Sequence, residues 1–187
     1  MLTFEKKGIE NTTPTITLAL QEATKRQTDI VLATTTGKTA LEIMELAKQM
    51  NFTNKIIVVS HAYGFGKPGE NTLSQETREI LENNNIKVVT ASHVLSGAER
   101  GLSNKYQGVY PVQIIADTLR MLSQGIKVCV EISVMALDAG QIAYGKPMVC
   151  VGGSGRGADT IAIVTPAHAN HILETKINEI IAKPFIG

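Results

Sequence analysis

The sequence has no tryptophan and few aromatic residues of any kind. Aromatic residues make up 4% of its 187 positions, and the formal net charge is +1 without a block of basic residues. Proteins that bind single-stranded nucleic acids stack bases on aromatic side chains, and nucleic-acid-binding surfaces concentrate positive charge. We therefore expect no nucleic-acid partner.

Long apolar runs are also absent. No uninterrupted apolar stretch reaches the length of about 20 residues that a transmembrane helix needs. The segment from Met1 to Lys7 lacks the basic-then-apolar order of a signal peptide. We expect a soluble cytoplasmic protein that does not bind a membrane.

Cysteine occurs only twice, at Cys129 and Cys150, and neither position has the spacing of a metal-binding motif. We expect both side chains to be small buried hydrophobic groups. We expect no metal site, and no disulfide in a chain without an export signal.

The sequence does contain short β-rich apolar runs that alternate with helical patterns, in a composition of 43% hydrophobic and 19% charged residues. This alternation is typical of βαβ units and a parallel sheet. No linker or change of composition divides the chain, so residues 1–187 are expected to form a single α/β domain. Strands are predicted over residues 29–33, 55–59, 86–89, 147–151 and 160–164. The last strand is expected to be antiparallel, because its connection is too short for a helical crossover.

Helical patterns fill most of the segments between the strands. Thr72 and Gln75 form a capping-box pattern at the start of one helix, and Gly125 interrupts the pattern that begins at Pro111. Residues 91–108 have no clear period, and we expect a long functional loop there. The helices are predicted to begin near Asn11, Lys38, Thr72, Pro111 and Val128, with a closing helix over residues 168–182.

Small, hydroxyl and glycine residues follow the predicted strands. In a parallel sheet, ligands bind beyond the carboxyl ends of the strands. Four such segments meet at this edge of the predicted sheet, namely residues 34–39, 60–66, 90–100 and 152–159. Their convergence favours a ligand site at this edge.

The loop after the first predicted strand has the clearest anion-binding character. It consists of Thr34, Thr35, Thr36, Gly37, Lys38 and Thr39. Gly37 lets the backbone approach an anion closely, and the N–H groups at the start of the following helix point outward. The threonine hydroxyls can donate to phosphate oxygens, and Lys38 adds a positive charge. We predict a phosphate site; the alternative is that the threonines only cap the helix.

Two glycine-rich nucleotide motifs do not fit this sequence. The loop at residues 34–39 lacks the first glycine and the long spacer of a Walker A loop, so we do not infer hydrolysis of a nucleoside triphosphate. Residues 152–157 superficially resemble a dinucleotide-binding fingerprint, but a strand follows them where that motif requires a helix.

The loop after the second strand could form the wall of a pocket. It begins with Ser60 and His61, and Tyr63 and Phe65 could cover a flat ring. His61 could be a hydrogen-bond partner or an acid–base group, although a histidine at a strand end is more often a satisfied polar residue. His93, after the third strand, is a weaker candidate.

We interpret the turn after the fourth strand as a hairpin loop that closes over a ligand. Arg156 would contact an anion and Asp159 would anchor the turn; a flexible turn without a ligand is the alternative. The residues assigned to this part of the site are Gly153, Ser154, Gly155, Arg156 and Asp159.

Two acidic residues lie seven positions apart on an otherwise apolar predicted helix. Glu131 and Asp138 therefore share a helix face. They could line the pocket, pair with Arg100 or Arg156, or lie on a partly solvated face.

The stretch Ile30 to Ala40, with its strand, Thr-Thr-Thr-Gly-Lys-Thr-Ala loop and following helix, resembles the C-terminal domain of pyruvate kinase. There, a similar Ser/Thr-Gly loop binds the phosphate of the sugar-bisphosphate effector. The chain is more similar still to small stand-alone relatives of that domain, which are uncharacterised proteins associated with bound flavin mononucleotide (FMN). The resembling stretches are residues 8–12, 34–40, 60–66, 131–140 and 152–159.

The resemblance implies a three-layer α/β/α sandwich with a mostly parallel five-stranded sheet and one antiparallel edge strand. It implies FMN as cofactor, with its phosphate on Thr34 to Thr39. The ring would then lie towards Ser60, His61 and Phe65, with the turn from Gly153 to Asp159 nearby. Nothing in the sequence resembles the catalytic barrel of pyruvate kinase, so kinase activity is not expected.

Three functions follow as hypotheses. The first is a flavin-binding protein, which could be an oxidoreductase of unknown reaction. The second is a regulatory module that senses a sugar phosphate without catalysis, and the third is a phosphate-ester enzyme that uses His61 or Asp159. Self-association into a homo-oligomer is expected for a small ligand-binding domain with many apolar residues.

Overall fold

A single seven-stranded sheet forms the centre of the structure, a computed structural model that describes residues 1–186. The strand order is β1-β7-β6-β5-β2-β3-β4. The strands are β1 (Leu2–Lys6), β2 (Ile30–Thr34), β3 (Ile56–Ser60), β4 (Lys87–Thr90), β5 (Met148–Gly152), β6 (Thr160–Thr165) and β7 (Lys176–Ile186).

The sheet is mostly parallel. Strands β5, β2, β3 and β4 run parallel to one another, β6 is antiparallel to both β5 and β7, and β1 is parallel to β7. The predicted α/β fold and the antiparallel direction of β6 are confirmed. The sheet has seven strands, not five, and β6 lies inside it because β7 and β1 extend the sheet beyond β6.

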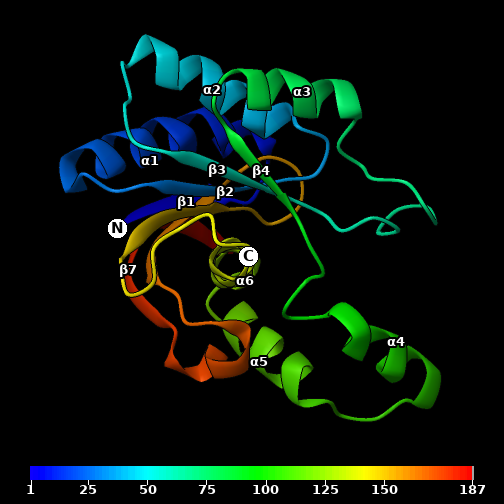
Figure 1. Cartoon of the computed structure of the whole chain (residues 1–187). Helices are drawn as coiled ribbons and strands as arrows, with labels where there is room; N and C mark the ends of the chain where they lie inside the picture. The colour runs from blue at the N-terminus through cyan, green and yellow to red at the C-terminus, as the bar shows by residue number, and fades with distance from the viewer. Residues whose placement is uncertain (187) are drawn as a thin grey trace.

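Helices cover both faces of the sheet, as Figure 1 shows. One face carries α1 (Thr12–Arg26), α2 (Lys38–Gln49) and α3 (Gln75–Asn83). The other carries α6 (Gln124–Asp138), with α5 (Pro111–Arg120) packed on it and α4 (Gly97–Tyr106) beyond. Short 3-10 helices lie at Ile9–Asn11 (η1) and Ala169–Glu174 (η2).

The hydrophobic core divides into one cluster for each face of the sheet. Alternate residues of β2 point to opposite faces, so Ile30 and Leu32 pack beneath α1 and α2 while Val31 packs beneath α6. The central strands are therefore buried on both faces, which explains why they are continuous apolar runs in the sequence. Both cysteines are buried free thiols, as predicted.

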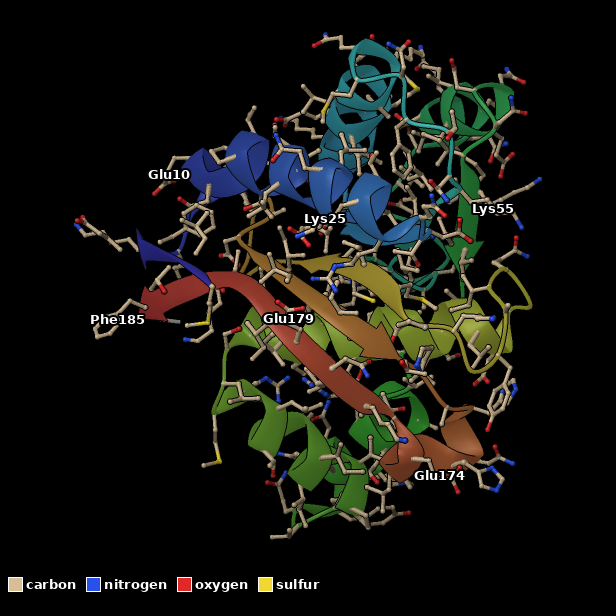
Figure 2. All side chains as sticks on the ribbon, turned by 90° about the vertical axis from the view of Figure 1, so that its left-hand side faces the viewer. Glu10, Lys25, Lys55, Glu174, Glu179 and Phe185 are labelled. Carbon is tan, nitrogen blue, oxygen red and sulfur yellow. The ribbon has the colours of Figure 1, made fainter. Side chains whose placement is uncertain are left out.

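The predicted closing helix over residues 168–182 is wrong. The chain there forms η2 and then the long strand β7, which crosses the side of the molecule seen in Figure 2 from near Glu174 past Glu179 to Phe185. Ile177, Ile180 and Ile181 have the i, i+3, i+4 spacing of a helix. In the structure the register of β7 against β6 shifts at two places, and Ile177 and Ile180 face one cluster while Ile181 faces the other.

Three other predictions need correction. The segment 91–108 is not one long loop, because it contains α4, which has no buried residue and therefore no apolar period to detect. Gly125 does not separate two helices but lies in the first turn of α6. The N-cap of α3 is Ser74, whose hydroxyl accepts a hydrogen bond from the Thr77 amide, and not Thr72.

Within residues 1–186, no helix combines the length and the apolar character needed to cross a membrane.

Candidate functional site

The carboxyl ends of β2 and β3 open on a cavity of about 680 Å³, within the usual size range of small-molecule sites. The cavity brings together most of the residues that the sequence predicts for the site. Those that line it are Thr34, Thr35, Thr36, Lys38, Thr39, Ser60, His61, Phe65, Gly153, Gly155 and Arg156. Gly37, Ser154 and Asp159 support the cavity without lining it.

The loop from Thr34 to Thr39 forms a tight connection between β2 and α2. The Gly37 amide donates to Thr34 Oγ1 over 3.1 Å, and the Gly37 carbonyl accepts the first hydrogen bond of the helix, from the Leu41 amide. Gly37 has φ +92°, and a Cβ there would lie 2.4 Å from Thr77 Cγ2. A glycine is therefore required for both the backbone conformation and the packing against α3.

Several donors of this loop face the cavity without a protein partner. Thr39 is only 9% exposed and lines the cavity, and its hydroxyl has no hydrogen-bond partner among residues 1–186. Thr36 and Lys38 are exposed and line the same cavity. Thr36 directly precedes the N-cap residue Gly37, and Lys38 is the first residue of α2, where the backbone N–H groups and the helix dipole also favour an anion.

Thr72 ties this loop to the segment before α3. Its hydroxyl donates to the Thr35 carbonyl oxygen over 2.8 Å. Asn71, next to it, donates from Nδ2 to the carbonyl oxygen of His61 over 2.9 Å. The loops after β2 and β3 are therefore held together by one short segment.

His61 and His93 form a pair at the ends of the adjacent strands β3 and β4. His61 Nδ1 lies 3.2 Å from His93 Nε2, and His61 Nε2 lies 3.3 Å from Thr35 Oγ1. The ring of Phe65 stacks on the imidazole of His61, with 3.7 Å between centroids and 3° between planes. Phe65, which was expected to cover a flat ring, therefore covers the imidazole of His61.

Burial and the neighbouring His93 lower the pKa of His61 to about 4. Burial also lowers the pKa of His93, although the carboxylate of Glu131 opposes that change. Both imidazoles are therefore neutral at pH 7, and each has one N–H donor and one lone pair.

The glycine-rich turn after β5 closes one side of the cavity. The carboxylate of Asp159, which is 2% exposed, accepts hydrogen bonds from the Ser154 amide, the Ser154 hydroxyl and the Thr160 hydroxyl. Asp159 therefore holds the turn in shape, while the exposed side chain of Arg156 lines the cavity.

Helix α6 supplies an apolar wall that the sequence analysis did not assign, beside Glu131, which was suggested as a residue that could line the pocket and does so. Val128, Ile132 and Met135 line the cavity together with Glu131. Apolar residues at helical spacing ordinarily indicate core packing, so nothing in the sequence distinguished them. Ile9 and Thr12, at the start of α1, also line the cavity; they fall within a stretch that resembles the stand-alone relatives, residues 8–12, but were not chosen as site residues.

Neither predicted partner of the two acidic residues on α6 is correct. Glu131 forms a buried ion pair with Lys127 and accepts a hydrogen bond from the Leu95 amide over 3.1 Å. Asp138 pairs with His168 over 2.7 Å at the other end of the helix, and it does not line the cavity.

Together these features define an α/β domain with a glycine- and hydroxyl-rich loop at the start of a helix and a partly apolar cavity at the carboxyl edge of its sheet. The sequence model of the family described as "Pyruvate kinase, alpha/beta domain" matches residues 15–164. The match covers most of the chain, and the chain therefore belongs to the pyruvate kinase alpha/beta domain family.

Proposed function

We propose that this chain binds FMN, with the phosphate on the loop from Thr34 to Thr39 and the ring in the apolar part of the cavity. The observation that carries the proposal is the position of Thr39, a residue that is only 9% exposed and lines the cavity from the first turn of α2. There its hydroxyl can donate a hydrogen bond to a phosphate oxygen, beside the N–H groups at the start of the helix.

The lining of the cavity suits the two ends of this ligand. Thr36, Lys38 and the start of α2 offer donors and positive charge for a phosphate dianion. Val128, Ile132 and Met135 of α6 offer an apolar surface for a flat ring in the same cavity. Bound FMN would supply one- or two-electron redox chemistry.

The direct test is FMN binding to the purified protein. We expect a flavin absorbance band in the protein as isolated or after FMN is added, and quenched flavin fluorescence on titration. Riboflavin, which lacks the phosphate, should bind about 10 to 100 times more weakly, because charge-assisted hydrogen bonds contribute about 1.5–3 kcal/mol each. Colourless protein that gives no calorimetric signal with FMN would refute the proposal.

A matched pair of variants locates the phosphate. Thr39→Val removes the hydroxyl and keeps the shape of the side chain, and it should weaken FMN more than riboflavin. Thr118→Val is the control: this threonine lies on the exposed face of α5, and its hydroxyl donates to the Ile114 carbonyl. Equal losses for FMN and riboflavin in Thr39→Val would place the phosphate elsewhere.

A sugar-phosphate sensor without catalysis is the second candidate. The observation that favours it is the polar rim of the cavity, where Thr12, Glu42 and Arg156 could meet the hydroxyl groups of a sugar. In that case a hexose bisphosphate would displace FMN, or it would bind to a protein that shows no affinity for FMN. Thr36→Ala would weaken the binding of the hexose bisphosphate. A flavin-dependent oxidoreductase remains an extension of the first candidate and needs redox turnover to support it.

A further inference from the structure

The hydrogen positions of the pair formed by His61 and His93 follow from their contacts. The Ala62 amide lies 3.4 Å from His93 Nε2 and can only donate to it, so this nitrogen is an acceptor. His61 Nδ1 lies 3.2 Å from the same nitrogen, and it must therefore supply the hydrogen of that contact. Neutral His61 is then left with a lone pair on Nε2.

This lone pair fixes the direction of the Thr35 hydroxyl. His61 Nε2 lies 3.3 Å from Thr35 Oγ1, and because the nitrogen accepts, the hydroxyl donates its hydrogen to it. Thr35 then presents only oxygen lone pairs to the cavity. An anion bound at the loop from Thr34 to Thr39 would therefore meet the hydrogen-bond acceptor Thr35 Oγ1 where it needs a donor.

Charged groups surround this pair from every element that packs around it. They are Lys127 and Glu131 on α6, Arg100 on α4, Lys38 and Glu42 on α2, and Arg156 in the glycine-rich turn. Lys127 and Glu131 are paired with each other in the interior. No carboxylate is hydrogen-bonded to either imidazole among residues 1–186, so a dianion in the cavity would be a new and close negative charge for His61.

We propose that the site takes up a proton when it binds a phosphate dianion, and that His61 is the group that accepts it. Protonation at Nε2 makes His61 the donor to Thr35, which frees the Thr35 hydroxyl to donate to a phosphate oxygen. One proton thus adds a positive charge and converts Thr35 from an acceptor to a donor. The inference rests on the proposed phosphate site and specifies how that site is regulated by pH.

The direction of the effect follows from linkage. Burial and His93 keep His61 neutral in the free protein at pH 7, with a pKa of about 4. A negative charge within about 4–6 Å raises a neighbouring pKa by about 1 to 3. The anion therefore binds more tightly as the pH falls below the raised pKa, by up to about tenfold for each pH unit.

Calorimetry in buffers of different ionisation enthalpy measures the protons taken up on binding. The probes are FMN and inorganic sulfate. The phosphate group of FMN titrates with a pKa of about 6 and so contributes its own proton to the measurement, whereas sulfate stays a dianion throughout and contributes none. At about pH 5.5 we expect the wild type to take up as much as about one proton more per ligand than His61→Gln. The affinity for sulfate should rise as the pH is lowered in the wild type and stay level in the variant.

His171→Gln is the control, since this exposed histidine lies away from the cavity, and it should behave as the wild type. If the wild type and His61→Gln both bind FMN or sulfate and take up equal numbers of protons, then anion binding is not coupled to protonation of His61. That result would refute this inference but not the proposed phosphate site. Absence of binding by both probes overturns the phosphate site and, with it, this inference.

A second measurement avoids the variant altogether. NMR titration of the His61 ring in the wild type, with and without saturating sulfate, reports its protonation directly. We expect the titration midpoint to move to higher pH when sulfate is bound. An unchanged midpoint with sulfate bound refutes the proposal, even if His61→Gln does not fold.

Discussion

Thr12 Oγ1 accepts a hydrogen bond from the Ala158 amide over 3.1 Å, and this bond joins residues 146 positions apart in the sequence. It fixes the glycine-rich turn after β5 to the first residue of α1. The two segments form adjoining parts of the cavity wall, because Thr12, Gly155 and Arg156 all line it. The position of Arg156 therefore depends on a contact with the beginning of the chain.

Gly157→Ala should break this junction. Gly157 has φ +79°, and a Cβ there would lie 2.2 Å from Thr12 Oγ1 and 2.9 Å from Ile9 Cα. We expect a loss of about 1–2 kcal/mol for the left-handed backbone and about 1–3 kcal/mol more for the displaced contact. Urea denaturation measures the total, and FMN titration should show weaker binding.

Gly140→Ala is the matched control for that substitution. Gly140 has φ +68°, but a Cβ there meets nothing within 4 Å. Gly140→Ala should lose only the stability that the left-handed backbone conformation costs, and it should leave FMN binding unchanged. If the two variants lose equal stability, then displacement of Thr12 and loss of its hydrogen bond with Ala158 cost nothing.

Gly37→Ala should separate the loop from Thr34 to Thr39 from its packing against α3. With φ +92° and a Cβ only 2.4 Å from Thr77 Cγ2 and 2.8 Å from Leu73 Cδ1, the loop must move away from α3. We expect a loss of at least about 1–2 kcal/mol in stability and at least a tenfold loss of FMN affinity. Gly69→Ala, at φ +78° in open space, should lose stability but keep its affinity. Full FMN affinity in Gly37→Ala would show that this loop does not hold the phosphate.

The conformation of the loop from Thr34 to Thr39 was predictable because its character is local. A strand, a glycine and hydroxyl residues at a helix start lie within a few positions, and their geometry follows from rules for single elements. The pairing of His61 with His93 depends instead on which strands are neighbours in the sheet. The sequence placed both histidines at strand ends, but their mutual distance requires β3 beside β4.

The fold was predictable wherever strands are buried on both faces. The two additional strands, β1 and β7, are partly exposed, and the apolar spacing in β7 is the same as in a helix. The decisive information for β7 is its pairing with β6, which no local pattern contains. The apolar wall from α6 was missed for a related reason, since side chains that line a cavity and side chains that fill a core have the same spacing.

Glu131→Gln should destabilise the protein strongly at pH 7. Glu131 and Lys127 are a buried ion pair, 6% and 5% exposed, and removal of one partner leaves an uncompensated charge that costs about 3–5 kcal/mol. The glutamine can still accept from the Leu95 amide, so the change isolates the charge. Chemical denaturation at pH 7 measures the loss.

The pH dependence of this variant distinguishes charge from packing. Burial already lowers the pKa of Lys127, and without Glu131 it should fall further, so the folded state releases the proton more easily than the unfolded state. Stability then rises with pH, and Glu131→Gln should recover part of its loss near about pH 9.5. In the double variant with Lys127→Met no such recovery is expected. Equal stability of Glu131→Gln at both pH values would contradict this explanation.

His61 should make the free protein sensitive to acid. Its pKa in the folded state is about 4, below the ordinary 6.5, so between these two values the unfolded chain binds a proton at this position and the folded chain does not. The contribution of His61 to the free energy of unfolding is therefore complete above about pH 6.5 and is lost progressively as the pH falls towards 4. In His61→Gln this part of the pH dependence disappears, so its Tm should fall less than that of the wild type between about pH 7 and pH 4.5. His171→Gln should show the full decrease of the wild type. If Tm falls equally in the wild type and His61→Gln, then His61 titrates alike in the folded and unfolded chains, and the contacts with His93 and Phe65 do not hold it neutral.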